Sequence, residues 1–177
     1  MKKISEKSIT DLEFDVVLEQ AASRCATELG KSSLLTLRPF TSFSRIQIEI
    51  ERVNEYNSSF SNEHNIPNHG FESIEKALGL LSIENSKIEI ELFQHIAHLA
   101  KTAQTLLRFF KKTKLFFPQL HKFGEDIPIE KSIPKEVDRV IDRFGEVRNQ
   151  ASDSLAVIRK QMDQVRGKIS QSFGSAM

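Results

Sequence analysis

Hydrophobic residues recur at intervals of three and four along most of the chain, which is the spacing of amphipathic α-helices. The first pattern predicts a helix from about residue 12 to 29. Its apolar face would carry Phe14, Val17, Leu18, Ala21, Ala22, Cys25 and Leu29. Thr10 and Glu13 fit a capping box at its start, and Gly30 is expected to end or kink it. A short helical piece should follow and stop at Pro39.

The second pattern predicts a helix from about residue 44 to 60. Its apolar positions are Ile46, Ile50, Val53 and Phe60. Residues 61–70 are polar and rich in Asn and His, so we expect a solvated, mobile loop there. A short helix is expected from about residue 72 to 81.

The third pattern runs from about residue 87 to 112 and predicts a helix of roughly 39 Å. Ser86 and Glu89 fit a second capping box at its start. Its seam has the alternating three-and-four steps of a heptad. The seam residues are Leu92, Ile96, Leu99, Ala103, Leu106 and Phe110. We expect this helix to form the backbone of the domain.

Residues 115–133 are expected to be irregular, because Pro118, Gly124 and Pro128 interrupt them and Pro134 follows. A short helix from about 135 to 142 and a turn or brief extended piece at 144–147 come next.

The last pattern predicts a helix from about residue 152 to 173 with a thin apolar seam. The seam residues are Leu155, Ile158, Met162, Val165 and Ile169. Periodicity alone leaves two alternatives open for this helix. It either folds back as the last helix of a bundle, or leaves toward a partner or a continuing domain. In both cases the fold class is all-α.

The composition narrows the classes of function. The 25 basic and 24 acidic residues nearly balance, so net charge is no argument for a nucleic-acid partner and none against a local basic patch. Cys25 is the only cysteine, so an internal disulfide cannot form. There is no apolar stretch approaching the roughly 20 residues of a membrane span, and no signal peptide at the N-terminus. We therefore expect a cytoplasmic protein that does not enter membranes.

No complete catalytic constellation emerges from the sequence. Gly30-Lys31-Ser32 ends like a P-loop, but the motif needs a glycine where Cys25 stands and a strand before it. His95 and His98, with Glu91 one turn earlier, have metal-ligand spacing but no evident further ligand. The other histidines, His64, His69 and His121, lack a nucleophile with an orienting partner.

Two basic stretches have alternative interpretations. Arg108, Lys111, Lys112 and Lys114 close the long helix, where they complement its negative end. Four residues of the last helix could contact a phosphate backbone, or form a solvated face. These are Arg159, Lys160, Arg166 and Lys168.

Three segments, read in order, resemble one protein family. Leu12-Glu13-Phe14-Asp15 resembles its opening motif, and 28–31 with the leucines up to Pro39 resembles its continuation. Residues 141–152, with the sequence IDRFGEVRNQAS, and the following Leu155, Ile158 and Arg159 resemble a third motif. The family is the second bacterial subfamily of MutS proteins, and the resemblance covers about residues 8–170. The chain departs from it at Asn149, where an acidic residue is usual, and in the polar loop 62–70.

This resemblance implies a helical core or lever domain of MutS type over residues 1–150, with 151–177 beginning a lever helix toward a clamp. The ATPase domain, which uses ATP and Mg²⁺, and the Smr-type nuclease domain would lie outside these residues. This segment would have no cofactor or metal. The whole protein would form a homodimer, bind branched or double-stranded DNA, and suppress homologous recombination or act on stalled ribosomes.

Three functional hypotheses follow. The first is a non-catalytic core and lever module that couples ATPase state to a DNA clamp. The second is a freestanding helical protein–protein interaction module that uses the last helix. The third, the weakest, is an enzyme with a metal at His95 and His98.

Overall fold

A computed structural model describes residues 4–175, and the side chains of residues 4–172. Within this range all regular structure is helical apart from one isolated β-bridge, which confirms the all-α class. The helices are α1 (Glu6–Asp11), α2 (Phe14–Ala22), α3 (Glu28–Leu35), α4 (Phe43–Ser58), α5 (Glu75–Leu81), α6 (Ile90–Lys112), α7 (Pro118–Gly124), α8 (Ser132–Val140) and α9 (Asp153–Ser175). None of these helices is long and apolar enough to cross a bilayer.

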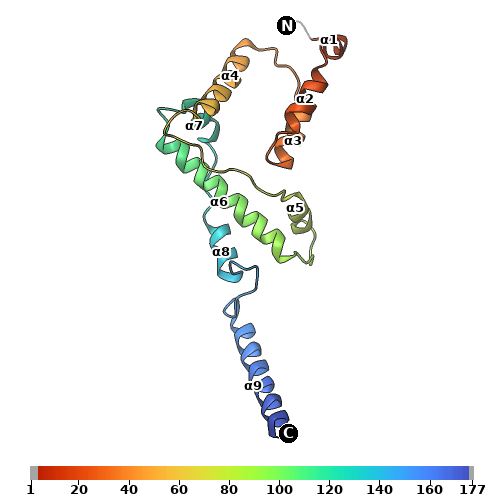
Figure 1. Cartoon of the computed structure of the whole chain (residues 1–177), viewed down its shortest axis with the longest axis vertical. Helices are drawn as coiled ribbons and strands as arrows, with labels where there is room; N and C mark the ends of the chain where they lie inside the picture. The colour runs from red at the N-terminus through yellow and green to blue at the C-terminus, as the bar shows by residue number, and fades with distance from the viewer. Residues whose placement is uncertain (1–3, 176–177) are drawn as a thin grey trace.

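The long helix α6 is the backbone of the body, as predicted. Helices α5, α7 and α8 pack against it, and α4 packs against α7 (Figure 1). Leu92 of the predicted seam is buried, and the other five seam residues are half-buried. Ala97, which lies beside the seam, is also buried. Phe117 is fully buried beside Phe109 and Phe110, whose ring centroids lie 5.8 and 6.2 Å away.

The contact between α4 and α7 depends on a carboxylate. Both oxygens of Glu55 accept backbone hydrogen bonds from the start of α7, from the N–H of Gln119 at 2.8 Å and of Leu120 at 2.9 Å. Pro118 occupies the first position of α7, where no N–H is needed. A side chain 64 residues away therefore caps a helix in a region that the sequence predicted to be irregular.

The predicted helix over 12–29 is wrong, because the chain breaks twice there. Glu13 adopts a left-handed backbone (φ 50°) between α1 and α2, and residues 23–27 separate α2 from α3. The predicted Thr10–Glu13 capping box does not form, because Glu13 itself is the N-cap of α2 without a side-chain bond and the Thr10 hydroxyl donates to the Glu6 carbonyl. Ser5 caps α1 and Thr27 caps α3. Gly30 lies inside α3, where its N–H donates to the Thr27 hydroxyl at 3.0 Å.

Two further predictions are wrong, one for the apolar face of the second helix and one for the start of α6. Ile50 and Val53 of α4 are exposed, and so is Phe60 just beyond its end, because the side facing α7 uses the polar Glu55. The predicted box at Ser86 is also wrong, since the Ser86 hydroxyl donates to the Leu80 carbonyl and Glu89 makes no side-chain cap.

The polar loop 61–70 packs on the body more than predicted. The Tyr56 hydroxyl and His69 Nε2 are 3.3 Å apart, and the His64 ring lies 4.1 Å from that of Phe116. Both histidines are half-buried. The loop is therefore held in part by its rings and is not simply solvated.

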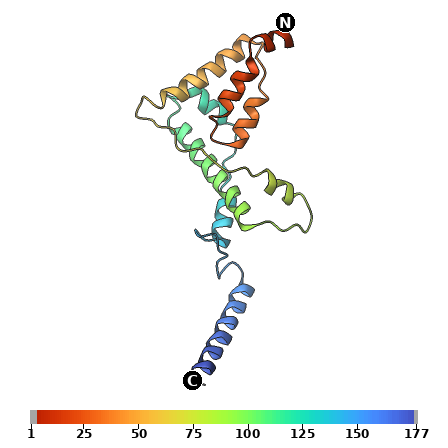
Figure 2. The same ribbon diagram turned by 45° about the vertical axis from the view of Figure 1, so that its right-hand side comes forward.

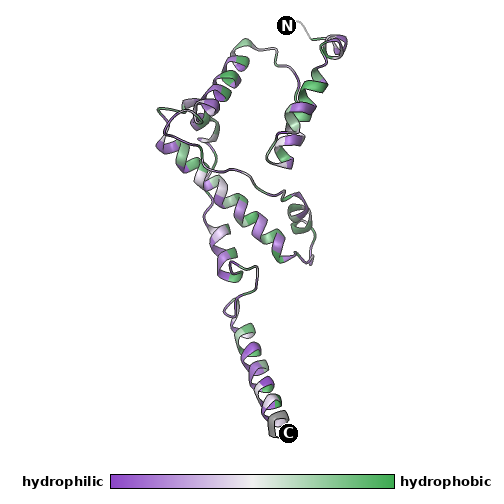
Figure 3. Cartoon of the chain, viewed as in Figure 1, coloured by the Kyte–Doolittle hydropathy of each residue, from purple (hydrophilic) through white to green (hydrophobic). Residues whose placement is uncertain are grey.

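The last helix stands apart from the body, so within the described residues it does not fold back as the last helix of a bundle. Helix α9 contacts no other helix of the described residues and extends alone from the base of the molecule (Figures 1 and 2). Its seam is exposed, with 51% of Ile158, 54% of Val165 and 51% of Ile169 accessible. The green seam is visible along the free helix in Figure 3.

The whole molecule is extended. It exposes 14114 Å², whereas a compact monomer of 20.2 kDa exposes roughly 8,800 Å². Within the described residues, helices α1–α3 also pack only on one another. Several apolar faces therefore have no covering element in this part of the chain.

Candidate functional site at the base of the last helix

A tight turn joins α8 to the segment that leads into α9. Ile141 and Val147 form an isolated antiparallel bridge, and Asp142 N–H donates to Glu146 O at 2.9 Å. Gly145 sits at the tip of the turn with φ +83°, a conformation that glycine adopts without steric cost. This confirms the turn or extended piece predicted at 144–147.

The carboxylate of Asp142 organises this turn. Its Oδ1 accepts hydrogen bonds from the N–H of Phe144 at 2.8 Å and of Glu146 at 3.0 Å. These two bonds, from Glu146 first, lower the pKa of Asp142, and the nearby Arg148 and Arg143 charges lower it further. The ionised carboxylate is therefore the form that the turn requires.

Three arginines, which we call the junction arginines, connect α8, the turn and α9. Arg139 of α8 donates to the Ala151 carbonyl at 3.4 Å, and Arg148 donates through Nε to the Asp138 carbonyl at 2.9 Å. Arg159 of α9 donates to the Val147 carbonyl at 2.9 Å and to the side-chain oxygen of Asn149. Because α9 contacts no other helix of residues 4–175, these bonds and the connecting backbone set its direction.

The structure does not gather the four predicted nucleic-acid contacts on one face. Arg159 is half-buried and bonded to the junction, while Lys160, Arg166 and Lys168 are exposed. At about 100° per residue, Lys160 lies about a quarter-turn from Arg159 and Lys168 lies on the opposite side of the helix. Arg166 lies on the same side as Arg159.

The other sequence candidates form no reactive site in the described part of the chain. No group of three or more His, Cys, Asp or Glu that could hold a metal occurs there. His95 Nε2 lies 3.9 Å from Glu91, and His98 is exposed. Gly30-Lys31-Ser32 is helical, so it forms no phosphate-binding loop. Cys25 is half-buried in the break after α2, which corrects its predicted place on the apolar face of a helix.

Among the open hollows of the described residues, two lie along α6. One of about 290 Å³ lies between α6 and α8, where Lys101 and Asp138 form an ion pair at 2.7 Å. The other, of about 300 Å³, is apolar and lies among α4, α6 and α7, with Tyr56 and His69 at its edge. The Tyr56 hydroxyl and His69 Nε2 form a hydrogen bond, and Pro67 O lies 3.0 Å from His69 Nδ1. These contacts hold the loop 61–70 against α4.

No family model matches this chain. Individual relatives do match, and they agree with one another. Endonuclease MutS2 of Bacillus velezensis is 27% identical over 176 residues, which cover 94% of this chain and 21% of that protein. Putative endonuclease MutS2 of Bacillus subtilis is 26% identical over 169 residues, covering 94% and 21%. Endonuclease MutS2 of Symbiobacterium thermophilum is 26% identical over 159 residues, covering 90% and 20%.

The chain is a relative of these MutS2 proteins. It spans about a fifth of the length of the curated relatives that it matches, so their named endonuclease activity describes the whole relatives. The matched stretch covers almost the whole chain, which agrees with the order of the three resembling motifs. Of the junction arginines, Arg148 and Arg159 lie in the third motif, whereas no sequence signal identified Arg139.

Proposed function

We propose that this chain is a non-catalytic structural module of a MutS2-like protein, in which α9 is the first part of a lever arm. The observation that carries the proposal is the free helix α9, held at its base by the junction arginines and covered by no other helix within residues 4–175. A helix of 23 residues is roughly 34 Å long. A rotation of 10° at its base would displace its tip by about 6 Å.

In this proposal residues 1–150 form a core domain and 151–177 begin the lever. The lever would couple the state of an ATPase domain, which binds ATP and Mg²⁺ elsewhere in the parent protein, to a DNA clamp. The parent would be a cytoplasmic homodimer that binds branched or double-stranded DNA. It would suppress homologous recombination or act on stalled ribosomes. Support for these functions is the resemblance to MutS2 proteins, and the absence of catalysis in this segment rests on the lack of any assembled reactive site among the described residues.

A spin-label distance measurement tests the lever directly. In a Cys25→Ser background, labels at Thr105→Cys on α6 and Gln164→Cys on α9 report the direction of α9 relative to the body; both positions are exposed. A fixed lever gives one narrow distance distribution. A distribution as broad as that of a disordered tether would refute the lever.

An activity assay tests the non-catalytic assignment. The purified chain should hydrolyse no ATP and cleave no plasmid DNA above the background of a mock purification. ATP turnover that co-purifies with the chain through three columns would contradict the proposal.

The alternative function is a helical interaction module that pairs through the seam of α9, and the exposure of that seam favours it. The positions that flank the seam argue against a second copy as partner. These are Ser154, Arg159, Gln161, Arg166 and Lys168, which include no acidic residue to pair with a basic one. Sedimentation distinguishes the two functions: a monomer at 100 μM supports the lever, and a dimer that Val165→Asp abolishes supports the interaction module.

A further inference from the structure

Positive charge is segregated along this nearly neutral chain. The 33 residues from 92 to 124, which comprise most of α6 and all of α7, contain six Lys or Arg and no Asp or Glu. Since the chain has 25 basic residues in all, the remaining positions carry 19 basic against all 24 acidic residues. Net charge therefore hides a local basic region.

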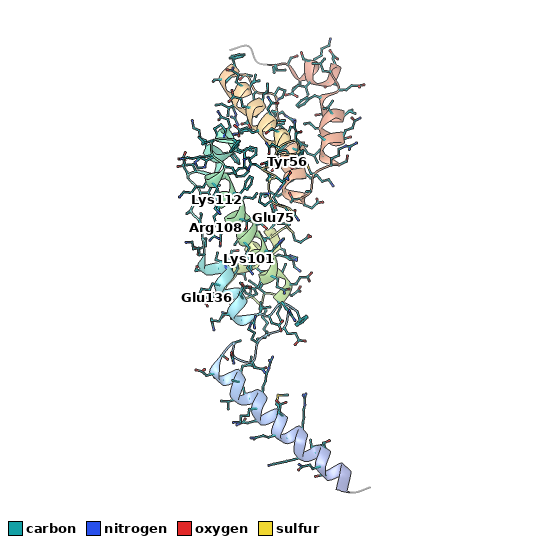
Figure 4. The ribbon with its side chains drawn as sticks, turned by 60° about the vertical axis from the view of Figure 1, so that its left-hand side comes forward. Tyr56, Glu75, Lys101, Arg108, Lys112 and Glu136 are labelled. Carbon is teal, nitrogen blue, oxygen red and sulfur yellow. The ribbon has the colours of Figure 1, made fainter. Side chains whose placement is uncertain are left out.

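Four of the six bases lie close together at the end of α6. We call Arg108, Lys111, Lys112 and Lys114 the α6 basic cluster; all four are exposed. Among the described residues, no carboxylate lies within 4.0 Å of any of the four, and Arg108 donates a 3.5 Å bond to the amide oxygen of Gln104. Figure 4 shows Arg108 and Lys112 projecting along the same edge of the body.

The helix dipole accounts for only part of this cluster. Lys111 and Lys112 occupy the last turn of α6, where cations complement the negative helix end. Arg108 lies before that turn and Lys114 lies beyond the helix. Arg108 is also three and four residues from Lys111 and Lys112, a spacing at which like charges repel. The fold alone gains nothing from that repulsion, whereas a bound polyanion would relieve it.

The cluster suits a phosphate backbone better than the basic residues of α9 do. Arg108 to Lys112 span roughly 6 Å of helix axis, with Lys114 two residues beyond the helix end. A similar length of duplex carries about three to four phosphate charges. The bases of α9 are instead distributed around the helix and interspersed with Asp153 and Asp163, and Arg159 is bonded to the junction.

We propose that the α6 basic cluster binds the phosphodiester backbone of nucleic acid without reading sequence. This places a nucleic-acid contact on the body of the molecule, whereas the proposed lever function places contact at a clamp beyond α9. The two proposals are tested independently, because replacing the cluster should leave the spin-label distance between α6 and α9 unchanged.

Fluorescence anisotropy of a labelled 30-base-pair DNA duplex, titrated with the full chain, tests this proposal. We expect a Kd of about 1–100 μM at 50 mM salt, the range of non-specific binding. Four phosphate contacts would give a slope of log K against log salt concentration of about −3.6. A duplex RNA of the same sequence forms a second arm: binding of either polymer or both supports the proposal and identifies the source of the phosphates.

Matched triple variants locate the contact. K111Q/K112Q/K114Q should weaken binding at least tenfold and reduce the slope by about 2 to 3. K160Q/R166Q/K168Q on α9 also removes three positive charges, and its Kd should stay within twofold of that of the unchanged chain. Replacing the same three lysines of the cluster by arginine keeps the charge and should keep the affinity. Circular dichroism confirms that each variant is folded.

Four results would overturn the proposal. They are no binding at 100 μM protein and 50 mM salt, unchanged binding by K111Q/K112Q/K114Q, a greater loss with the α9 triple variant, and competition by poly-glutamate that equals DNA at the same concentration of charge. The last result would show a docking site for acidic protein segments.

Discussion

Replacing Arg159 by alanine should release α9 from its fixed direction. The guanidinium donates to the Val147 carbonyl at 2.9 Å and to the side-chain oxygen of Asn149, and the residue is half-buried. A net value of about 1 kcal/mol for each hydrogen bond gives a loss of about 2 kcal/mol. That corresponds to roughly a 30-fold change in the ratio of molecules in which α9 is held by these bonds to molecules in which it is not.

This loss should appear as motion and not as global unfolding, because α9 contributes no packing to the body in the described residues. An excursion of 20° at the base of a helix roughly 34 Å long moves its tip by about 12 Å. In the double-label experiment with Thr105→Cys and Gln164→Cys, whose second label lies about halfway along α9, Arg159→Ala should therefore broaden the distance distribution by several ångströms. The thermal unfolding midpoint of the body should change by less than about 2 °C.

Arg166→Ala is the matched control, since Arg166 lies on the same side of α9 two turns further from the body and is exposed. It should leave the distribution as narrow as in the labelled parent. An unchanged distribution in Arg159→Ala would show that the backbone of residues 147–152 fixes α9 and that the arginine bonds do not. Equal broadening in both variants would show that the effect is not specific to the bonds of Arg159.

Three further predictions concern the elements that hold the body and the junction. Glu55→Ala should destabilise the body by about 1.5–3 kcal/mol in urea unfolding, because it removes a charged cap from two N–H groups of α7. Glu51→Ala removes one exposed side-chain bond to Gln119 and should destabilise it by less than about 1 kcal/mol. Equal losses in the two variants would contradict the capping role of Glu55. Gly167→Ala should raise the helical content measured by circular dichroism, since no atom lies near the position of its new Cβ and α9 has no packing to offset the roughly 1 kcal/mol cost of glycine in a helix. Gly124→Ala should not raise the unfolding midpoint, because its new Cβ would lie 2.7 Å from the end of the Leu107 side chain, which must move; a clear rise would contradict this contact. Asp142 has a lowered pKa in the folded chain, so its contribution to stability is complete above the ordinary aspartate pKa of about 3.9 and is lost as pH falls through the lower folded pKa. The difference in unfolding midpoint between the unchanged chain and Asp142→Asn should therefore persist at pH 7 and shrink below about pH 4. A difference independent of pH would show that the carboxylate charge is not involved.

The sequence alone determined the elements whose cause is local. The three-and-four spacing of apolar residues placed α4, α6 and α9 to within a few residues, because a helix needs one apolar side to be stable in water. The turn at Gly145 was also readable, since few residues other than glycine adopt φ +83° without strain. The ordered motifs predicted the kinship with MutS2 proteins, which the comparisons confirm.

Tertiary structure decided the features that depend on distant partners. Helix α7 forms where prolines and a glycine predicted irregular chain, because Glu55 supplies from 64 residues away the cap that local sequence lacks. Periodicity could not detect the break at 23–27, since the apolar spacing continues through it while Thr27 starts a new helix. It also could not tell which side of α4 faces the body, because polar side chains make that contact.

The direction of α9 belongs to this second group. Its seam is equally compatible with a bundle and with a free arm, and only the three-dimensional arrangement shows that no helix of the described chain covers it. The assignment of Lys160, Arg166 and Lys168 to nucleic acid stays a prediction. Arg159 has a structural partner that its sequence neighbours do not reveal, because hydrogen bonds to backbone carbonyls leave no pattern in residue type.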